Sequence, residues 1–356
     1  MLENFSFTSY VVDTDIKSLL KKELSKYKKV LVITGEKSLK SFEEKLEYAL
    51  NKKEHLIKNY GGECSYSNVE EILKESCDKG FDLVLGIGGG KSIDTAKLTA
   101  FKMDLPVITI PTIASTCAAT SSLSVVYNEN GSFLEIAEFP APAVKTFIDL
   151  ETIKRAPNKY IWAGMGDTLA KFYELDLKYR YTLKNSVPIN YPSRLGKECS
   201  TLCRELILKY GEQAYFSKRL DEPFKKVVLS IIVNTGMVSN LINEELNGAI
   251  AHSVCYGLGN IPSVEKNHLH GEMVAFGILV QLLLEKNIEE YHTLFDFYKK
   301  VNFPTVLTKF ISLKEFEKVE DKVLDIILNS VDIPYLEKMG FVFEKSELKK
   351  AMFFNI

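Results

Sequence analysis

Short runs rich in valine and isoleucine alternate with amphipathic stretches over the first 150 residues of this chain. The sequence predicts strands at 29–34, 54–60, 81–87, 106–111 and 145–148, and helices at 38–53, 68–79 and 92–103. Ser67 or Asn68 is expected to cap the second of these helices. Strands that alternate with helices of about 10–15 residues form βαβ units with parallel strands. We therefore expect an α/β domain on a parallel sheet, with a hairpin around the turn at 128–131.

The strand signals fade after residue 151, and the chain reads as helical almost throughout from about residue 160. Breaks are expected at 188–193, 257–266 and 302–304. A length of 356 residues suits about two domains. We expect an α/β domain over 1–155 and an all-helical domain over 156–356.

Composition and charge narrow the functional classes. The chain is 46% hydrophobic and 26% charged, which is ordinary for a globular protein. Its 45 basic and 47 acidic residues leave no basic excess for nucleic acid. The sequence has no apolar run of about 18 residues, no signal-peptide pattern and no CxxC pair among its six cysteines. A cytoplasmic protein that binds neither membranes nor nucleic acid is expected.

Three consecutive glycines, Gly88, Gly89 and Gly90, join a predicted strand to a predicted helix and are followed by Lys91. Glycines at such a turn let a phosphate approach the backbone, and the first N–H groups of the helix point at it. The spacing is neither GxGxxG nor that of a P-loop. A tight turn without a ligand is the alternative, but three glycines cost stability if they do nothing, which favours a phosphate site.

A second loop, at 111–122, is rich in serine and threonine and follows the next predicted strand. In open α/β sheets, ligands bind at the carboxyl ends of parallel strands. A solvated loop is the plain alternative. On its own this loop is weak evidence of a binding site, and it supports one only in combination with the glycine loop.

Two histidines and an aspartate form a candidate metal site in the helical half. Three of the five histidines fall between His252 and His270, and Asp167 lies at what reads as a helix start. Two imidazoles and a carboxylate suit a catalytic divalent metal with an open position. Asp167 is equally well interpreted as a helix cap. His268 and His292 are expected to be surface or structural residues.

Taken together, these segments resemble the iron-containing alcohol dehydrogenase superfamily, in its glycerol dehydrogenase-like branch. The resemblance rests on segments in family order, namely 88–91 with Asp94, 111–116, 123–125, 164–167 and 270–277. It implies a dinucleotide-binding α/β domain and a helical metal-binding domain. Asp167, His252 and His270 would hold the metal. The residues implied for NAD or NADP are Gly35, Gly88, Gly89, Gly90, Lys91, Asp94, Thr112, Ser115, Ser121, Leu123 and Tyr127.

Two departures from the family pattern bear on substrate and cofactor. Cys117 stands where glycerol dehydrogenases typically carry an aspartate that helps to hold the substrate. The sequence around Cys117, together with residues 172–174, resembles the hydroxycarboxylate dehydrogenases of the same branch more than the glycerol dehydrogenases. Hydroxycarboxylate dehydrogenases reduce 2-oxoacids. Gly35 stands where NAD-selective members often have an aspartate that repels a 2′-phosphate. NADP is therefore permitted, and Lys37 could assist it.

Two further departures concern the metal. Lys171 replaces the additional histidine of the iron-dependent members, one helical turn after Asp167. The three remaining ligands favour zinc over iron, with a fourth place for water or substrate. Cys255 replaces a histidine that many relatives have three residues after His252, which argues against a proton relay there.

The resemblance implies a metal-dependent, NAD(P)-linked oxidoreductase that acts on the CH–OH group of a small polyol, as glycerol dehydrogenases do. The alternative is a hydroxycarboxylate dehydrogenase that reduces 2-oxoacids with NADPH. A lyase of the dehydroquinate synthase type is a more distant alternative. It would require a glutamate ligand and a basic pocket, whereas this sequence has Asp167 as the carboxylate and few lysines or arginines around 234–277. A non-catalytic binding protein is disfavoured by the intact ligand set. A homo-oligomer is expected, as for many soluble enzymes.

Overall fold

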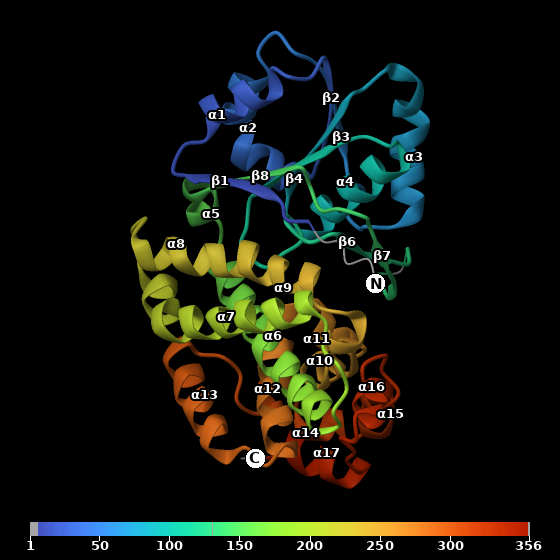
Figure 1. Cartoon of the computed structure of the whole chain (residues 1–356), viewed down its shortest axis with the longest axis vertical. Helices are drawn as coiled ribbons and strands as arrows, with labels where there is room; N and C mark the ends of the chain where they lie inside the picture. Colours follow the sequence, from blue (N-terminus) through green and yellow to red (C-terminus); the bar gives the residue numbers. More distant parts are fainter. Residues whose placement is uncertain (1–5, 130, 355–356) are drawn as a thin grey trace. The chain divides into compact units, whose positions relative to one another are not determined.

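The computed structural model describes residues 6–129 and 131–354, and the chain divides into two compact units, residues 1–160 and 161–356 (Figure 1). The first unit contains a parallel sheet covered by helices, and the second is built from helices. The expected fold class, an α/β domain followed by a helical region, is confirmed.

Six parallel strands form the sheet of the first unit in the order β1-β8-β5-β4-β2-β3. The strands are β1 (Ser9–Asp13), β2 (Lys29–Thr34), β3 (Glu54–Asn59), β4 (Leu83–Gly88), β5 (Val107–Pro111) and β8 (Lys145–Asp149). An antiparallel hairpin of β6 (Leu123–Tyr127) and β7 (Phe133–Glu138) lies apart from this sheet. The sequence predicted the hairpin and five of these six parallel strands. It did not predict β1.

Helices cover both faces of the sheet (Figure 1). On β2, Val30 and Val32 pack against α1 (Lys17–Leu24) and α2 (Glu36–Leu50), while Leu31 and Ile33 face α3 (Tyr66–Ser76) and α4 (Gly90–Lys102). Because successive side chains point to opposite faces, a strand buried on both sides is apolar throughout. This double burial explains the continuous apolar runs in the sequence.

Two helix starts in the first unit differ from the expectation. The predicted caps Ser67 and Asn68 are wrong, because Ser65 accepts the hydrogen bond from the Asn68 backbone N–H and α3 begins at Tyr66. Helix α4 begins at Gly90 rather than 92, with Gly89 as its N-cap residue. The last of the three glycines therefore lies in the first helical turn.

The chain reverses its direction across the sheet at β2 and β4. It runs from β2 outward to β3, and then returns to place β4 on the other side of β2. The register pairs Thr34 with Ile87, so the loops that follow these two strands leave the same edge side by side. Such a switch point is where open α/β sheets bind ligands.

Two helices of 26 residues, α6 (Lys159–Lys184) and α7 (Tyr191–Phe216), dominate the second unit, with α5 (Leu150–Arg155) preceding them in the first. The others are α8 (Glu222–Leu229), α9 (Thr235–Leu241), α10 (Ile250–Gly259), α11 (Pro262–Asn267), α12 (His270–Leu284), α13 (Ile288–Val301), α14 (Leu313–Phe316), α15 (Glu320–Leu328), α16 (Ile333–Lys338) and α17 (Lys345–Met352). A π-helical turn, Ser230–Asn234, joins α8 to α9. Among the described residues, no helix is long and apolar enough to cross a membrane.

The expected break at 257–266 is mostly wrong. Helix α10 continues to Gly259, and α11 begins at Pro262. Gly257 stays within its helix because it packs closely, with a Cβ at that position falling 2.6 Å from Ile327. A glycine that serves packing was therefore mistaken for one that ends a helix.

Candidate metal centre and dinucleotide loop

The glycine loop lies at the switch point of the sheet, between β4 and α4. Gly88 has a φ of 151°, which side chains rarely adopt, and a Cβ at Gly89 would lie 2.8 Å from Ile113. Gly90 is similarly covered, with a Cβ position 3.1 Å from the Thr116 hydroxyl. The serine- and threonine-rich loop after β5 thus packs directly on the glycine loop. The first N–H groups of α4 have no acceptors within the helix, as at any helix start, and suit an anion.

The remaining dinucleotide candidates of the two loops have different surroundings. Lys91 is half-exposed, forms an ion pair with Glu63 and lies 5.0 Å from the centre of the Tyr127 ring. Asp94, by contrast, is buried and forms an ion pair of 2.9 Å with Lys97. Its other oxygen accepts a hydrogen bond from the Val125 N–H. Asp94 therefore holds the segment that enters β6.

The same buried pair fixes two other candidates. The ammonium of Lys97 donates to the carbonyl oxygens of Ser121 and Leu123, and Ser121 itself is buried. Thr112 is also buried, and its N–H donates to the carbonyl of Gly88. Ser115 and Cys117 are partly exposed on the loop after β5, where the Cys117 carbonyl accepts from the N–H groups of residues 120 and 121.

Gly35 follows β2 on the other side of the switch point. It is the N-cap residue of α2, and its N–H donates to the Ser38 hydroxyl at 3.0 Å. A Cβ at Gly35 would lie 2.7 Å from the Tyr60 ring. Glu36 and Lys37, which follow Gly35 in the first turn of α2, are both exposed.

Asp167, His252 and His270 come together in the second unit. Oδ1 of Asp167 lies 3.5 Å from Nε2 of His252 and 3.6 Å from Nε2 of His270, and all three donor atoms lie within 4.8 Å of one another. A tetrahedral ion with bonds of about 2.1 Å spaces its ligand atoms about 3.4 Å apart. The donor set and its spacing therefore fit a divalent metal. The His270 side chain is 48% exposed, which leaves the cluster open on one side.

The interpretation of Asp167 as a helix cap is wrong. Asp167 lies in the middle of α6, on its buried side, rather than at a helix start. The preceding glycines suggested a break, but a Cβ at Gly166 would lie 2.2 Å from the backbone oxygen of Gly271. Gly166 thus serves a close approach between helices, and the helix continues through it.

Glycines bring the three ligand-bearing helices into backbone contact. A Cβ at Gly271, next to His270 on α12, would lie 1.9 Å from the carbonyl oxygen of Ala163 on α6. A Cβ at Gly277 would lie 2.4 Å from the carbonyl oxygen of Ala251, which precedes His252 on α10. No role in helix packing was expected for these glycines from the sequence. The sequence feature that could have indicated this packing is a glycine or alanine directly beside each candidate ligand.

The charges in this cluster are strongly coupled. Burial disfavours the charged forms, but the charge of Glu174 and the hydrogen bond with Asp167 outweigh it and raise the pKa of His252 to about 10. For Asp167, hydrogen bonds from His252 and His270 outweigh burial and hold the pKa far below its usual range. Because metal binding requires a neutral imidazole, a metal cation competes with protons for this cluster.

The two family departures near the metal have defined partners. Lys171 is turned toward Asn247 and donates to its Oδ1 at 2.9 Å. Cys255 is buried, and its Sγ lies 3.3 Å from Nδ1 of His270. A thiol in that place contacts a candidate ligand directly. His268 pairs with Glu272 of α12 at 2.9 Å, in agreement with the structural role expected for it.

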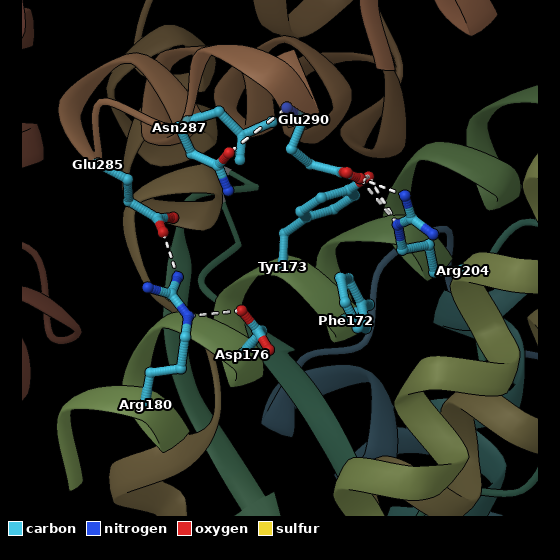
Figure 2. Close-up of a pocket in the computed structure, with 9 residues that line it drawn as sticks. Phe172, Tyr173, Asp176, Arg180, Arg204, Glu285, Asn287 and Glu290 are labelled. Atoms are coloured by element: carbon cyan, nitrogen blue, oxygen red, sulfur yellow. Dashed lines mark hydrogen bonds and ion pairs between the residues drawn. The ribbon is translucent and has the colours of Figure 1, made fainter. Parts of the chain in front are cut away.

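A separate cavity of 310 Å³ lies among α6, α7, α12 and the start of α13 (Figure 2). On one side Arg180 pairs with Asp176 and Glu285, and on the other Arg204 pairs with Glu290. Each arginine is thus paired with at least one carboxylate. None of the three metal-ligand candidates lines this cavity.

Comparison with known proteins agrees with the fold. The sequence model of the family described as "Iron-containing alcohol dehydrogenase" matches residues 8–144. Hydroxycarboxylate dehydrogenase A of Escherichia coli K12 is 34% identical over 332 residues, which cover 90% of this chain and 89% of that protein. Glycerol dehydrogenase of Thermotoga maritima is 36% identical over 279 residues, covering 75% of this chain and 73% of the relative. The crystal structure of glycerol dehydrogenase from Schizosaccharomyces pombe superposes with a TM-score of 0.84 at 27% identity, covering 98% of this chain and 89% of that one.

Proposed function

The chain belongs to the iron-containing alcohol dehydrogenase family and is an oxidoreductase of that family, and we propose that it is a metal-dependent, NAD(P)-linked dehydrogenase for the CH–OH group of a small polyol. Glycerol is the first candidate substrate, because several relatives are glycerol dehydrogenases. The family works with NAD(P) and a divalent metal. Zinc is the metal that the three-ligand set favours.

The observation that carries the proposal is the cluster of Asp167, His252 and His270. Three helices deliver these side chains to one point, with two histidine nitrogens 3.5 and 3.6 Å from the same carboxylate oxygen. A stability role alone would not explain it, because two buried or half-buried imidazoles and a carboxylate are costly to desolvate. A site that keeps one side open supports catalysis rather than a purely structural metal.

In the proposed reaction each unit has its own task. Asp167, His252 and His270 hold a divalent ion, which supplies Lewis acidity toward an alcohol or carbonyl oxygen. Gly89 and Gly90 admit the pyrophosphate of the dinucleotide to the start of α4, where backbone N–H groups receive it. The nicotinamide carries the hydride, while the protein contributes position and electrostatics. Residues 1–155 would thus be the dinucleotide-binding domain, and 156–356 the metal-binding domain.

A second candidate function is the reduction of 2-oxoacids with NADPH. Cys117 offers a thiol where an aspartate would hold a polyol hydroxyl, and a thiol is a weak hydrogen-bonding group. Gly35 itself has no carboxylate to repel a 2′-phosphate, and Lys37, two residues further along, is exposed, as is Glu36 between them. Hydroxycarboxylate dehydrogenase A also matches this chain over most of its length. Cys117 and Gly35 therefore favour this candidate specifically.

Absorbance of the reduced nicotinamide tests both candidates. Zinc-loaded protein would be offered glycerol and 1,2-propanediol with NAD or NADP, and 2-oxobutanoate and 2-oxoglutarate with NADH or NADPH. Turnover of the diols supports the polyol dehydrogenase, whereas turnover of the oxoacids, with NADPH preferred, supports the second candidate. Removal of the metal with a chelator should abolish either activity, and zinc should restore it.

Full activity of the metal-free protein would contradict metal dependence. Absence of any net change in nicotinamide absorbance with every substrate would contradict the dehydrogenase itself. A lyase of the dehydroquinate synthase type regenerates its cofactor and would therefore give no net change in nicotinamide absorbance.

A further inference from the structure

A buried carboxylate outside the proposed ligand set pairs with His252, the more buried of the two candidate histidine ligands. Glu174 lies on α6, and its side chain is 2% exposed. Its Oε2 lies 2.6 Å from Nδ1 of His252. Its Oε1 accepts hydrogen bonds from the backbone N–H groups of Ala249, at 2.7 Å, and of His252, at 2.9 Å. A single side chain therefore fixes both the ring of His252 and the first turn of the helix that carries it.

Glu174 belongs to a stripe of charged residues on one face of α6. Asp167, Lys171, Glu174 and Lys178 follow one another at helical spacings of four, three and four residues. Lys171, Glu174 and Lys178 contact the segment that leads into α10, whereas Asp167 faces His252 within that helix. Lys171 donates to the side chain of Asn247 at 2.9 Å, and Lys178 donates to its backbone oxygen at 3.0 Å. The stripe thus anchors this segment at several points, and Glu174 is the member outside the ligand set that reaches a candidate ligand.

The chemistry of a carboxylate determines which nitrogen of His252 is available. An ionised carboxylate only accepts hydrogen bonds, so Nδ1 must carry a proton to pair with Oε2. The lone pair of the neutral ring is then on Nε2, the nitrogen that faces Asp167. A metal needs that lone pair. Glu174 therefore selects the tautomer and the ring orientation that the proposed site requires.

His270 is held quite differently. Its Nδ1 faces the Sγ of Cys255 at 3.3 Å, and a thiol is a weak hydrogen-bonding partner. Its side chain is 48% exposed, against 12% for His252. One ligand is thus rigidly oriented by a buried carboxylate, and the other is loosely held at the open side.

We propose that Glu174 is the positioning residue of the metal centre, which keeps His252 in the orientation and tautomer that bind the ion. The proposal rests on the assignment of Asp167, His252 and His270 as ligands. It assigns Glu174 no contact with substrate or cofactor. Its loss acts through His252, so metal affinity falls before any effect on chemistry.

Glu174→Gln is the sharpest variant, because it keeps the shape of the side chain and removes only the charge and one acceptor. The amide of the variant must place its NH₂ group either against Nδ1 of His252 or against the two backbone N–H groups. Facing Nδ1, the NH₂ group forces the proton of the neutral ring onto Nε2 and removes the lone pair there. We expect zinc to bind about 10- to 100-fold more weakly, as for other partners of metal ligands.

Zinc affinity is measured by competition with a chromogenic chelator on folded, full-length protein. Glu285→Gln is the matched control, because Glu285 is a glutamate of the same unit with a 4% exposed side chain that pairs with Arg180 away from the cluster (Figure 2). The control should bind zinc as the wild type does. Cys255→Ser should cost less affinity than Glu174→Gln.

The outcomes separate the two levels of the proposal. A wild-type protein that binds no zinc overturns the ligand assignment itself. Equal zinc affinity of wild type and Glu174→Gln overturns the role of Glu174 while leaving the ligands in place. If Glu174→Gln does not fold, Glu174→Asp replaces it, since the shorter carboxylate cannot reach the ring and both N–H groups. An unchanged cobalt absorption spectrum and metal affinity in that variant also overturns the role.

Discussion

At the scale of single residues, the most consequential positions are glycines that carry no chemistry. Gly166 and Gly271 flank two of the candidate ligands, and each lets one helix touch the backbone of another. Glycine within a helix costs about 1 kcal/mol relative to alanine. The missing side chains allow close packing, and close packing brings Asp167 and His270 together.

Gly271→Ala should therefore damage stability and metal binding together. The added methyl group would lie 1.9 Å from the carbonyl oxygen of Ala163, so α6 and α12 must move apart. We expect a loss of about 1–3 kcal/mol in the free energy of unfolding, measured by urea denaturation, and weaker zinc binding. Gly259→Ala is the control, because its nearest neighbour lies at 3.8 Å. Wild-type stability and zinc affinity of Gly271→Ala would contradict this account.

The sequence identified the candidate metal ligands better than it predicted the helices that carry them. The clustering of histidines indicated His252 and His270, but Gly166 before Asp167 looked like a helix boundary. Local propensity favours that interpretation, and it fails because contact with Gly271 keeps the helix intact. Glu174 was noted only as part of the family-like segment 172–174, and its role beside His252 was missed because that role depends on a segment about 75 residues further along the chain.

At the scale of elements, helix α4 combines two charged residues with separate tasks. Lys91 is half-exposed in its first turn, near the glycine loop. Asp94, one turn later, is buried against Lys97 and the start of β6. We infer that Lys91 serves the dinucleotide and that Asp94 serves the fold, although the sequence pattern suggested cofactor binding for both.

Two substitutions in α4 test this division. Lys91→Met should weaken dinucleotide binding about tenfold, or about 1.4 kcal/mol, without changing stability. Asp94→Asn leaves the charge of Lys97 buried and uncompensated, and should cost about 3–5 kcal/mol in the free energy of unfolding. Fluorescence titration with NADH and NADPH measures the first effect, and urea denaturation the second. A stable Asp94→Asn protein, or unaltered cofactor affinity in Lys91→Met, would refute the division.

Among the elements, the strands that are buried on both faces gave the clearest sequence signals, whereas β1 was not predicted. The buried strands β2, β4 and β5 are continuous apolar runs, because helices cover both of their faces. Strand β1 has only five residues and lies at the sheet edge, with a mostly exposed pattern. Such a strand is determined by its pairing with β8, which the local sequence does not reveal.

At the scale of the whole molecule, two units of different architecture carry the two halves of the proposed chemistry. The family match over residues 8–144 falls in the first unit, together with the glycine loop. The candidate metal ligands all fall in the second. The sequence predicted an α/β fold followed by a helical region, whereas the substrate depends on single side chains such as Cys117, which the fold does not determine.

The metal content of the protein tests the central claim most directly. Wild type, Asp167→Asn and the control Asp176→Asn, which changes an aspartate of the same helix, would be stripped with a chelator, reloaded with zinc and desalted. We predict about one zinc ion per chain in wild type and control, as for a single catalytic site, and little zinc in Asp167→Asn. Equal zinc in all three proteins would contradict the assignment of the metal centre.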